Sequence, residues 1–178
     1  MLDLKKYLIL DIDQTLIDSS IRENFCYKEG VLCLETYKRV KHSHIWGICN
    51  DTLTPFGAWC EDNANKLASH YNIIILTARY CEDIDYAFFD CNLNQLKNNS
   101  IFIARDNCLK YGGNPNDQAS ATYKAQILKN ILGDKQGIML IDDCYKVLEM
   151  AKNNGYKAIN ATKLYHYNNC DFSSLFGV

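Results

Sequence analysis

The stretch Tyr7-Leu-Ile-Leu-Asp-Ile-Asp-Gln-Thr-Leu-Ile-Asp18 is the most informative part of this chain. Its apolar start, residues 7–10, predicts a buried strand, and Asp11 and Asp13 follow at the carboxyl end with Thr15 close behind. Open α/β sheets bind ligands where the loops leave the strands. Two acids in that place favour a hard cation and a nucleophilic or acid–base pair. Short Asp-x-Asp patterns also occur on solvated turns, so this segment alone does not distinguish a ligand site from an ordinary turn.

A second apolar strand ends in acids in the same way. The segment Gly137-Ile-Met-Leu-Ile-Asp-Asp143 places Asp142 and Asp143 after four apolar residues. If the two strands are parallel, four carboxylates meet in one crevice and raise each other's pKa values. A divalent cation removes that penalty, and oxygen donors without a His or Cys pattern favour Mg²⁺ over zinc. The metal ligands that we expect come from Asp11, Asp13, Asp142 and Asp143.

Two further segments carry groups that suit a phosphoryl ligand. The strand Ile73-Ile-Ile-Leu-Thr-Ala-Arg79 ends in the hydroxyl of Thr77, the backbone amide of Ala78 and the guanidinium of Arg79. Lys124 lies early in a helical pattern over residues 120–132. A hydroxyl, backbone amides and a lysine are the donors that a phosphoryl group needs around it. Lys110 and Lys129 are rivals for the lysine position, and Arg79 could instead be an ion-pair partner of the acids.

In this order, the four segments resemble the haloacid dehalogenase superfamily of phosphotransferases. Its Asp-x-Asp-x-Thr motif matches Asp11, Asp13 and Thr15, and its strand-closing Thr, its Lys and its acidic pair follow. The matching positions for these last three motifs are Thr77, Lys124 and the pair Asp142 and Asp143. The resemblance covers residues 7 to about 160. One departure is Gln14, where many members carry Gly, which leaves the tight turn of the backbone less certain.

The resemblance implies a fold and a mechanism. We expect a single α/β domain over residues 1–178, with a Rossmann-like parallel sheet sandwiched by helices and a small cap insertion at residues 18–53. Asp11 would be the nucleophile that forms an aspartyl-phosphate, and Asp13 the general acid and base. Mg²⁺ would be held by Asp11, the backbone carbonyl of Asp13, and Asp142 or Asp143, while Thr77 and Lys124 hold the phosphoryl oxygens.

Within the superfamily, the chain is most similar to the polynucleotide 3'-phosphatase branch. The likeness rests on Thr77-Ala-Arg79, on Arg105 after the third strand, and on Lys124-Ala-Gln-Ile-Leu128. It implies substrate contacts by Thr15, Ala78, Arg79 and Arg105, and a phosphate on a nucleic-acid end or a nucleotide as substrate. Two alternatives stay open: a phosphatase of small molecules such as nucleotides or sugar phosphates, and a non-catalytic binding module with the same fold.

Composition agrees with one small enzyme domain. The chain has 178 residues and a net charge of −2, which gives no global footprint for nucleic acid. We see no signal peptide and no membrane span, and nine cysteines without a Cys-x-x-Cys pair favour free thiols in the cytoplasm. A zinc site from Cys33, His42, His44 and Cys49 is imaginable, but its spacing matches no usual pattern.

The remaining expectations concern helices and the insertion. A helix over residues 54–69 should bury Phe56, Trp59, Cys60 and Leu67, and one over 81–92 should bury Ile84, Phe88 and Cys91. A third helix should run from about Tyr145 to Asn154. Because the insertion is short, the crevice should be open. Its basic run could be a solvated face or could touch a phosphate-bearing partner: Lys38, Arg39, Lys41, His42 and His44.

Overall fold

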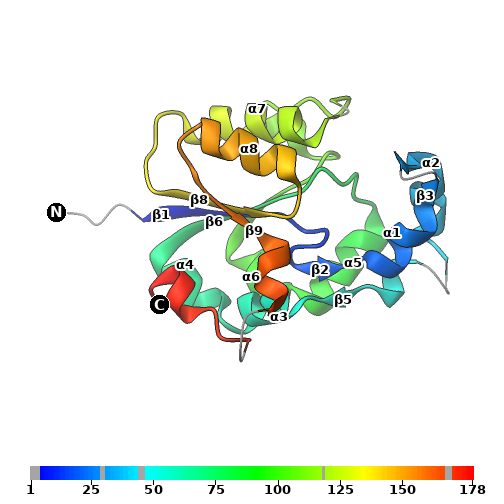
Figure 1. The fold of residues 1–178 in the computed structure, drawn as a ribbon, viewed down its shortest axis with the longest axis horizontal. Coiled ribbons are helices and arrows are strands. Elements are labelled where there is room, and N and C mark those ends of the chain that lie inside the picture. The colour runs from blue at the N-terminus through cyan, green and yellow to red at the C-terminus, as the bar shows by residue number, and fades with distance from the viewer. Residues whose placement is uncertain (1–4, 29–30, 44–46, 118, 167–169) are drawn as a thin grey trace.

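The computed structural model describes residues 5–28, 31–43, 47–117, 119–166 and 170–178, and has a five-stranded parallel sheet at its centre (Figure 1). The strand order is β7-β6-β1-β8-β9. The bounds are β1 Lys6–Leu10, β6 Tyr71–Leu76, β7 Ser100–Ile103, β8 Ile138–Asp142 and β9 Lys157–Asn160. Leu10 of β1 pairs with Ile75 of β6 and Ile141 of β8, so these three strands end at one edge. The expected Rossmann-like sheet is confirmed.

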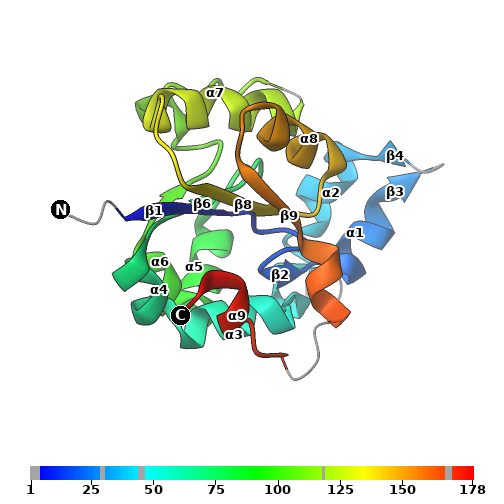
Figure 2. The ribbon, with the colours of Figure 1, turned by 60° about the vertical axis from the view of Figure 1, so that its left-hand side comes forward.

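Helices cover both faces of this sheet (Figures 1 and 2). On one face lie α7 (Ser120–Leu132) and α8 (Tyr145–Asn153), and on the other α3 (Pro55–Asp62), α4 (Ala64–His70), α5 (Asp83–Asn92), α6 (Asn94–Asn98) and α9 (Ser173–Phe176). Successive residues of β1 point to opposite faces, so Leu8 and Leu10 join one core cluster and Ile9 the other. Alternation along one buried strand thus serves two hydrophobic cores.

The helix expected over residues 54–69 is two helices that meet at Asn63. Thr54 caps α3 by accepting a hydrogen bond from the amide of Gly57 at 2.9 Å, and Pro55 follows at the first helical position. Asn63 leaves the helical conformation, and its side chain donates to the carbonyl of Trp59. The expected stripe still forms, since Phe56, Cys60 and Leu67 are buried and Trp59 is partly buried.

The buried face of α5 differs from the one that the apolar pattern predicted. Asp85 and Phe89 are buried, whereas Cys91 is exposed and Ile84 and Phe88 are partly buried. Asp85 faces inward because it caps the helix, accepting from the amide of Glu82, and because buried cations meet it there. The buried face of α5 therefore contains a charged residue, Asp85, in place of the most apolar side chains.

Residues 18–53 form a small substructure beside the carboxyl ends of the sheet (Figure 2). Strands β2 (Ile17–Asp18) and β5 (Thr52–Leu53) pair antiparallel at its base. Between them lie α1 (Ser20–Cys26), the hairpin of β3 (Tyr27–Lys28) and β4 (Val31–Leu32), α2 (Leu34–Val40) and η1 (Ile48–Asn50). Helices α1 and α2 pack on each other. We call this substructure the insertion.

Several other expectations can be compared directly with the structure. Helix α7 has the bounds that the sequence predicted, and α8 ends one residue earlier than expected. Between β7 and α7 lies η2 (Cys108–Tyr111). After β9 comes η3 (Ala161–His166). No described cysteine pairs in a disulfide. Within the described residues, no helix has the length and apolar content needed to cross a membrane.

Candidate active site

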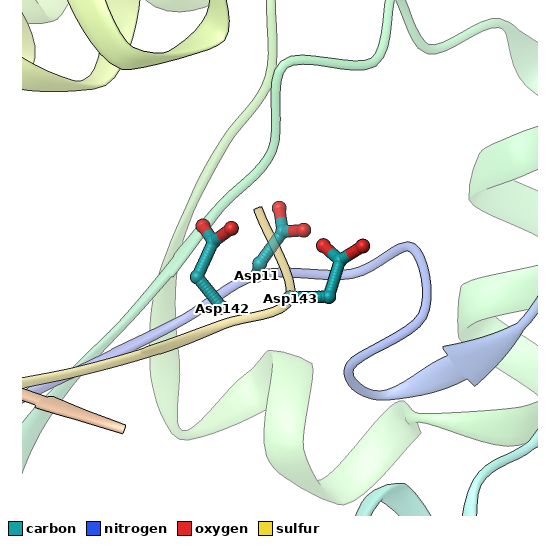
Figure 3. A group of neighbouring side chains, drawn as sticks. All are labelled: Asp11, Asp142 and Asp143. Carbon is teal, nitrogen blue, oxygen red and sulfur yellow. The ribbon is translucent and has the colours of Figure 1, made fainter. Parts of the chain in front are cut away.

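Three carboxylates gather where β1 and β8 end. Asp11 follows β1, Asp142 closes β8 and Asp143 comes next, and one oxygen of each lies within 4.8 Å of the others. Figure 3 shows the three side chains pointing to the same side of these strands. We call them the acid cluster. Because parallel strands end at one edge, acids far apart in the sequence meet here, as the two motifs predicted.

Burial and mutual repulsion raise the pKa values of two carboxylates in the acid cluster. Burial raises the pKa of Asp11 well above its usual value, and the neighbouring Asp142 and Asp143 raise it further against the opposing effect of Lys124. Burial and the charge of Asp142 raise the pKa of Asp143 to about 6. All donors of the cluster are carboxylate oxygens, which hard cations prefer. These residues fit Mg²⁺, which would offset their mutual repulsion.

Lys124 is the lysine that reaches this cluster. Its ammonium, on the second turn of α7, lies 2.6 Å from Oδ1 of Asp11 and 2.7 Å from Oδ2 of Asp142. Burial alone would lower the pKa of Lys124, but the two carboxylates outweigh it and raise that pKa. The rival residues Lys110 and Lys129 are exposed. Lys124 is therefore a fixed cation beside the expected nucleophile.

The end of β6 supplies the expected hydroxyl. Thr77 is buried, and its Oγ1 accepts a hydrogen bond from the amide of Arg79 at 3.0 Å, so its own proton stays available to a ligand. Thr77, Ala78 and Arg79 all line the cavity above the acid cluster. Thr15 differs, because it is fully buried and is not among the residues that line this cavity.

Asp13 is not part of the acid cluster and pairs with two arginines. Arg79 contacts its carboxylate through Nη2 and through Nε at 3.2 Å, and Nη2 of Arg22 lies 3.5 Å away. Burial would raise the pKa of Asp13, but Arg79 and then Arg22 lower it to about 2. The fourth expected acid is thus an ionised partner of arginine, and its role as a metal ligand through the backbone carbonyl stays a prediction.

The turn between Asp13 and Thr15 forms without glycine. Gln14 adopts a φ of 53°, the left-handed region that most residues avoid. Its side chain donates to Ser19 at 3.3 Å, and its carbonyl accepts from the hydroxyl of Tyr165 at 2.5 Å. These two contacts hold the turn that the sequence left uncertain.

The donors of Arg79 and Arg105 are already used by the protein. The second branch of Arg79 binds buried Asp85 at 2.9 Å, which makes it the ion-pair partner that the sequence allowed. Arg105 donates to the carbonyls of Ala78 and Pro115 and lies over the ring of Tyr123. Both arginines border the cavity, but neither extends freely as a phosphate grip.

The cavity over the acid cluster has a volume of about 480 Å³ and three walls. The strand ends form the first wall, the segment around Pro115 and Asn116 forms the second, and the insertion forms the third. The residues from the insertion are Glu23, Tyr27, Tyr37 and Lys41. The insertion therefore lines one side of the crevice, and the expectation that the crevice is open stays a prediction.

The basic run of the insertion is largely engaged in ion pairs. Lys41 is buried and lies 2.8 Å from Asp85, and His42 contacts the exposed Glu82 at 3.1 Å. Arg39 is exposed, and His44 lies outside the described residues. Lys41 and His42 therefore connect the insertion to the start of α5, whereas the side chain of Lys38 is outside the described residues. The imagined zinc site includes His44, and the metal cluster found among the described residues is made of carboxylates.

Sequence reasoning missed the buried charges that link the insertion to the site. Arg22 and Asp51 form a pair at 2.6 Å inside the insertion, and both are almost fully buried. Arg22 also reaches Asp13. The local sequence does not indicate that Arg22 and Asp51 are buried, because each is paired with a residue on another element.

The fold is shared with a solved haloacid dehalogenase-like hydrolase. A solved structure of a hydrolase of the haloacid dehalogenase-like family from Streptococcus pneumoniae matches with a TM-score of 0.60 at 15% identity, over 92% of each chain. The model of the bacteriophage T5 5'-deoxynucleotidase family matches residues 1–175, so the chain belongs to that family. No curated protein matches. The solved structure supports the fold expected from the resemblance, and neither match gives specific support to the polynucleotide 3'-phosphatase branch.

Proposed function

We propose that the protein is a Mg²⁺-dependent phosphomonoesterase that hydrolyses nucleoside 5'-monophosphates through an aspartyl-phosphate on Asp11. The observation that carries the proposal is the contact of Lys124 with both Asp11 and Asp142 beside the Thr77 hydroxyl. Nucleophile, cation and hydroxyl converge on the floor of one cavity, as phosphoryl transfer requires. The intact carboxylates argue against a non-catalytic module.

In the first half-reaction, a carboxylate oxygen of Asp11 bonds to phosphorus while the bond from phosphorus to the ester oxygen breaks. Asp13 gives its proton to the departing oxygen, which leaves as a nucleoside hydroxyl. Asp13 is ionised in the ligand-free site, and the dianionic phosphate adds negative charge beside it, which favours the protonation that this step needs. Thr77 and Lys124 hold the phosphoryl oxygens.

In the second half-reaction, Asp13 takes a proton from water, and the resulting hydroxide oxygen bonds to phosphorus. The bond between phosphorus and Asp11 breaks, which releases phosphate and restores the carboxylate. Asp11, Asp142, Asp143 and the backbone carbonyl of Asp13 would hold Mg²⁺. When bound, this ion neutralises phosphate charge that would otherwise repel the nucleophile.

A nucleotide suits the site better than a nucleic-acid end. The name of the matched family describes a 5'-deoxynucleotidase, and a cavity of about 480 Å³ is of the size that takes one small ligand. A long strand would need free cations beyond the phosphate, whereas Arg79, Arg105 and Lys41 are bound to protein oxygens. Deoxynucleoside 5'-monophosphates are therefore the substrates to test first.

The experiment is phosphate release from matched substrates with Mg²⁺ and with EDTA. We expect a deoxynucleoside 5'-monophosphate to exceed its 3'-isomer, a 3'-phosphorylated oligonucleotide and a sugar phosphate in kcat/KM. A faster reaction on the oligonucleotide, weakening as salt rises, would establish the nucleic-acid alternative instead. Absence of phosphate release from every substrate would leave the binding module.

A further inference from the structure

The carboxylate of Asp13 is held by residues from two different parts of the fold. Arg79 comes from the end of β6 in the core, and Arg22 comes from α1 of the insertion. The hydroxyl of Ser19, at the N-cap position of α1, lies within hydrogen-bond distance of the same carboxylate at 3.1 Å and of Glu23 at 2.7 Å. Two of the three contacts on Asp13 thus depend on the insertion being in place.

Burial of the Arg22 guanidinium is unfavourable for the stability of the fold. Its side chain is fully buried, and its nearest counter-charge is Asp51, at 2.6 Å. Its Nη1 has no hydrogen-bond partner among the described residues, and an unmet buried donor is destabilising. Buried ion pairs are often no more stable than apolar residues of similar volume. The packing of the insertion therefore gives no sufficient reason for an arginine here.

The surroundings of Arg22 fix its direction. Asp51 contacts both Nη2 and Nε, and the ring of Tyr37 lies over the guanidinium with 4.6 Å from its carbon to the ring centroid. A guanidinium held by a carboxylate on its edge and a ring on its face has little freedom to turn. The same Nη2 that binds Asp51 also lies 3.5 Å from Oδ1 of Asp13.

We propose that Arg22 is a positioning residue, through which the insertion aims the carboxyl of Asp13 at the leaving oxygen. The inference rests on the proposed function, because it assumes that Asp13 is the general acid of a phosphatase. Arg22 does not touch the cavity, so it acts on the reaction only through Asp13. A role for the insertion follows: it contributes to chemistry as well as enclosing the site.

A comparison of leaving groups separates positioning from structural support. The ester oxygen of a nucleotide is a poor leaving group that needs the proton of Asp13, whereas p-nitrophenolate departs as a stable anion without one. The ratio kcat/KM reports the steps up to aspartyl-phosphate formation, because departure of the leaving group is the first irreversible step. A misaimed Asp13 should therefore lower kcat/KM for the nucleotide and spare p-nitrophenyl phosphate.

The variants are Arg22→Lys and the double change Arg22→Met with Asp51→Asn, which removes both buried charges together. For the double variant we expect kcat/KM on a deoxynucleoside 5'-monophosphate to fall by about tenfold or more, a part of what general acid catalysis contributes. The value on p-nitrophenyl phosphate should stay within about twofold of wild type. Arg22→Lys keeps the charge and should recover part of the nucleotide rate.

Val40→Ala is the matched control, since Val40 is an uncharged buried residue of α2 in the same insertion. It should leave the ratio of the two kcat/KM values unchanged. Equal changes on both substrates in folded Arg22→Lys or in the double variant would overturn the inference and leave the phosphatase proposal standing. Lack of activity of the wild-type protein on both substrates would instead remove the proposed function itself.

Discussion

Lys124 lies 2.6 Å from Asp11, although 113 residues separate them in the chain. Their contact places a fixed positive charge on the carboxylate that we propose as nucleophile, and it exists because α7 packs on the sheet beside the end of β1. The burial of Lys124 is compensated only while this carboxylate and Asp142 are ionised. Chemistry and electrostatic balance at the site therefore depend on the same three groups.

The first prediction concerns the nucleophile. Asp11→Asn should reduce turnover by at least about a thousandfold while the fold is retained, because an amide has nearly the same shape but is not nucleophilic. The measurement is phosphate release by purified protein, with circular dichroism to check folding and mass spectrometry to exclude deamidation. Retention of a tenth of wild-type activity would remove Asp11 from this role.

The second prediction concerns the metal. Activity should disappear in EDTA and return with Mg²⁺, and Mg²⁺ should raise the melting temperature because it binds only the folded acid cluster. Asp142→Asn should abolish that shift, whereas Asp171→Asn, at an exposed residue, should leave it intact. Full activity in chelator would contradict a metal-assisted mechanism.

The third prediction is a pH dependence of the metal-free protein. The pKa of Asp143 is raised to about 6 by burial and by Asp142, against about 3.8 for an ordinary carboxyl. The folded state thus binds more protons than the unfolded state between these values, so the free energy of unfolding should fall as pH rises from about 4 to above 6. Denaturation in EDTA at several pH values measures this fall, and Asp143→Asn should reduce it.

The same raised pKa sets the direction for metal binding. Protons compete with Mg²⁺ for Asp143, so the apparent affinity for Mg²⁺ should weaken as pH drops through about 6. A Mg²⁺ affinity that stays constant from pH 7 to pH 5 would show that Asp143 is not a ligand.

The parts of the site that the sequence predicted share a local signature. Asp11, Thr77 and Asp142 each follow a run of apolar residues, so their positions at strand ends could be inferred from the strands themselves. Lys124 was assigned from its place early in an amphipathic helix whose bounds proved correct. Because β1, β6 and β8 pair in parallel, the residues that follow these strands lie close together.

The parts that could not be predicted depend on pairing between distant elements. The buried face of α5 follows from the contacts of Asp85 with Arg79 and Lys41, which hydrophobic periodicity does not encode. Arg22 is not part of an apolar pattern, and its burial depends on the opposite charge of Asp51 beside it. Hydrophobic periodicity places charged residues at the surface, so it does not predict buried networks of paired charges.

The last prediction concerns the anchor of the insertion on α5. Lys41 and Asp85 are both buried and lie 2.8 Å apart, and the ammonium also donates to the carbonyl of Tyr80 at 2.9 Å. Lys41→Met would leave a buried carboxylate with only Arg79 as a cation and should lower the free energy of unfolding by about 3 kcal/mol. Urea denaturation measures the change, with Glu82→Gln as the control, because Glu82 is exposed and contacts the same ammonium. That control should change stability by less than about 1 kcal/mol. A loss for Lys41→Met no larger than the control would mean that the buried pair does not anchor the insertion, and that its position over the cavity depends on the Arg22–Asp51 pair and on packing instead.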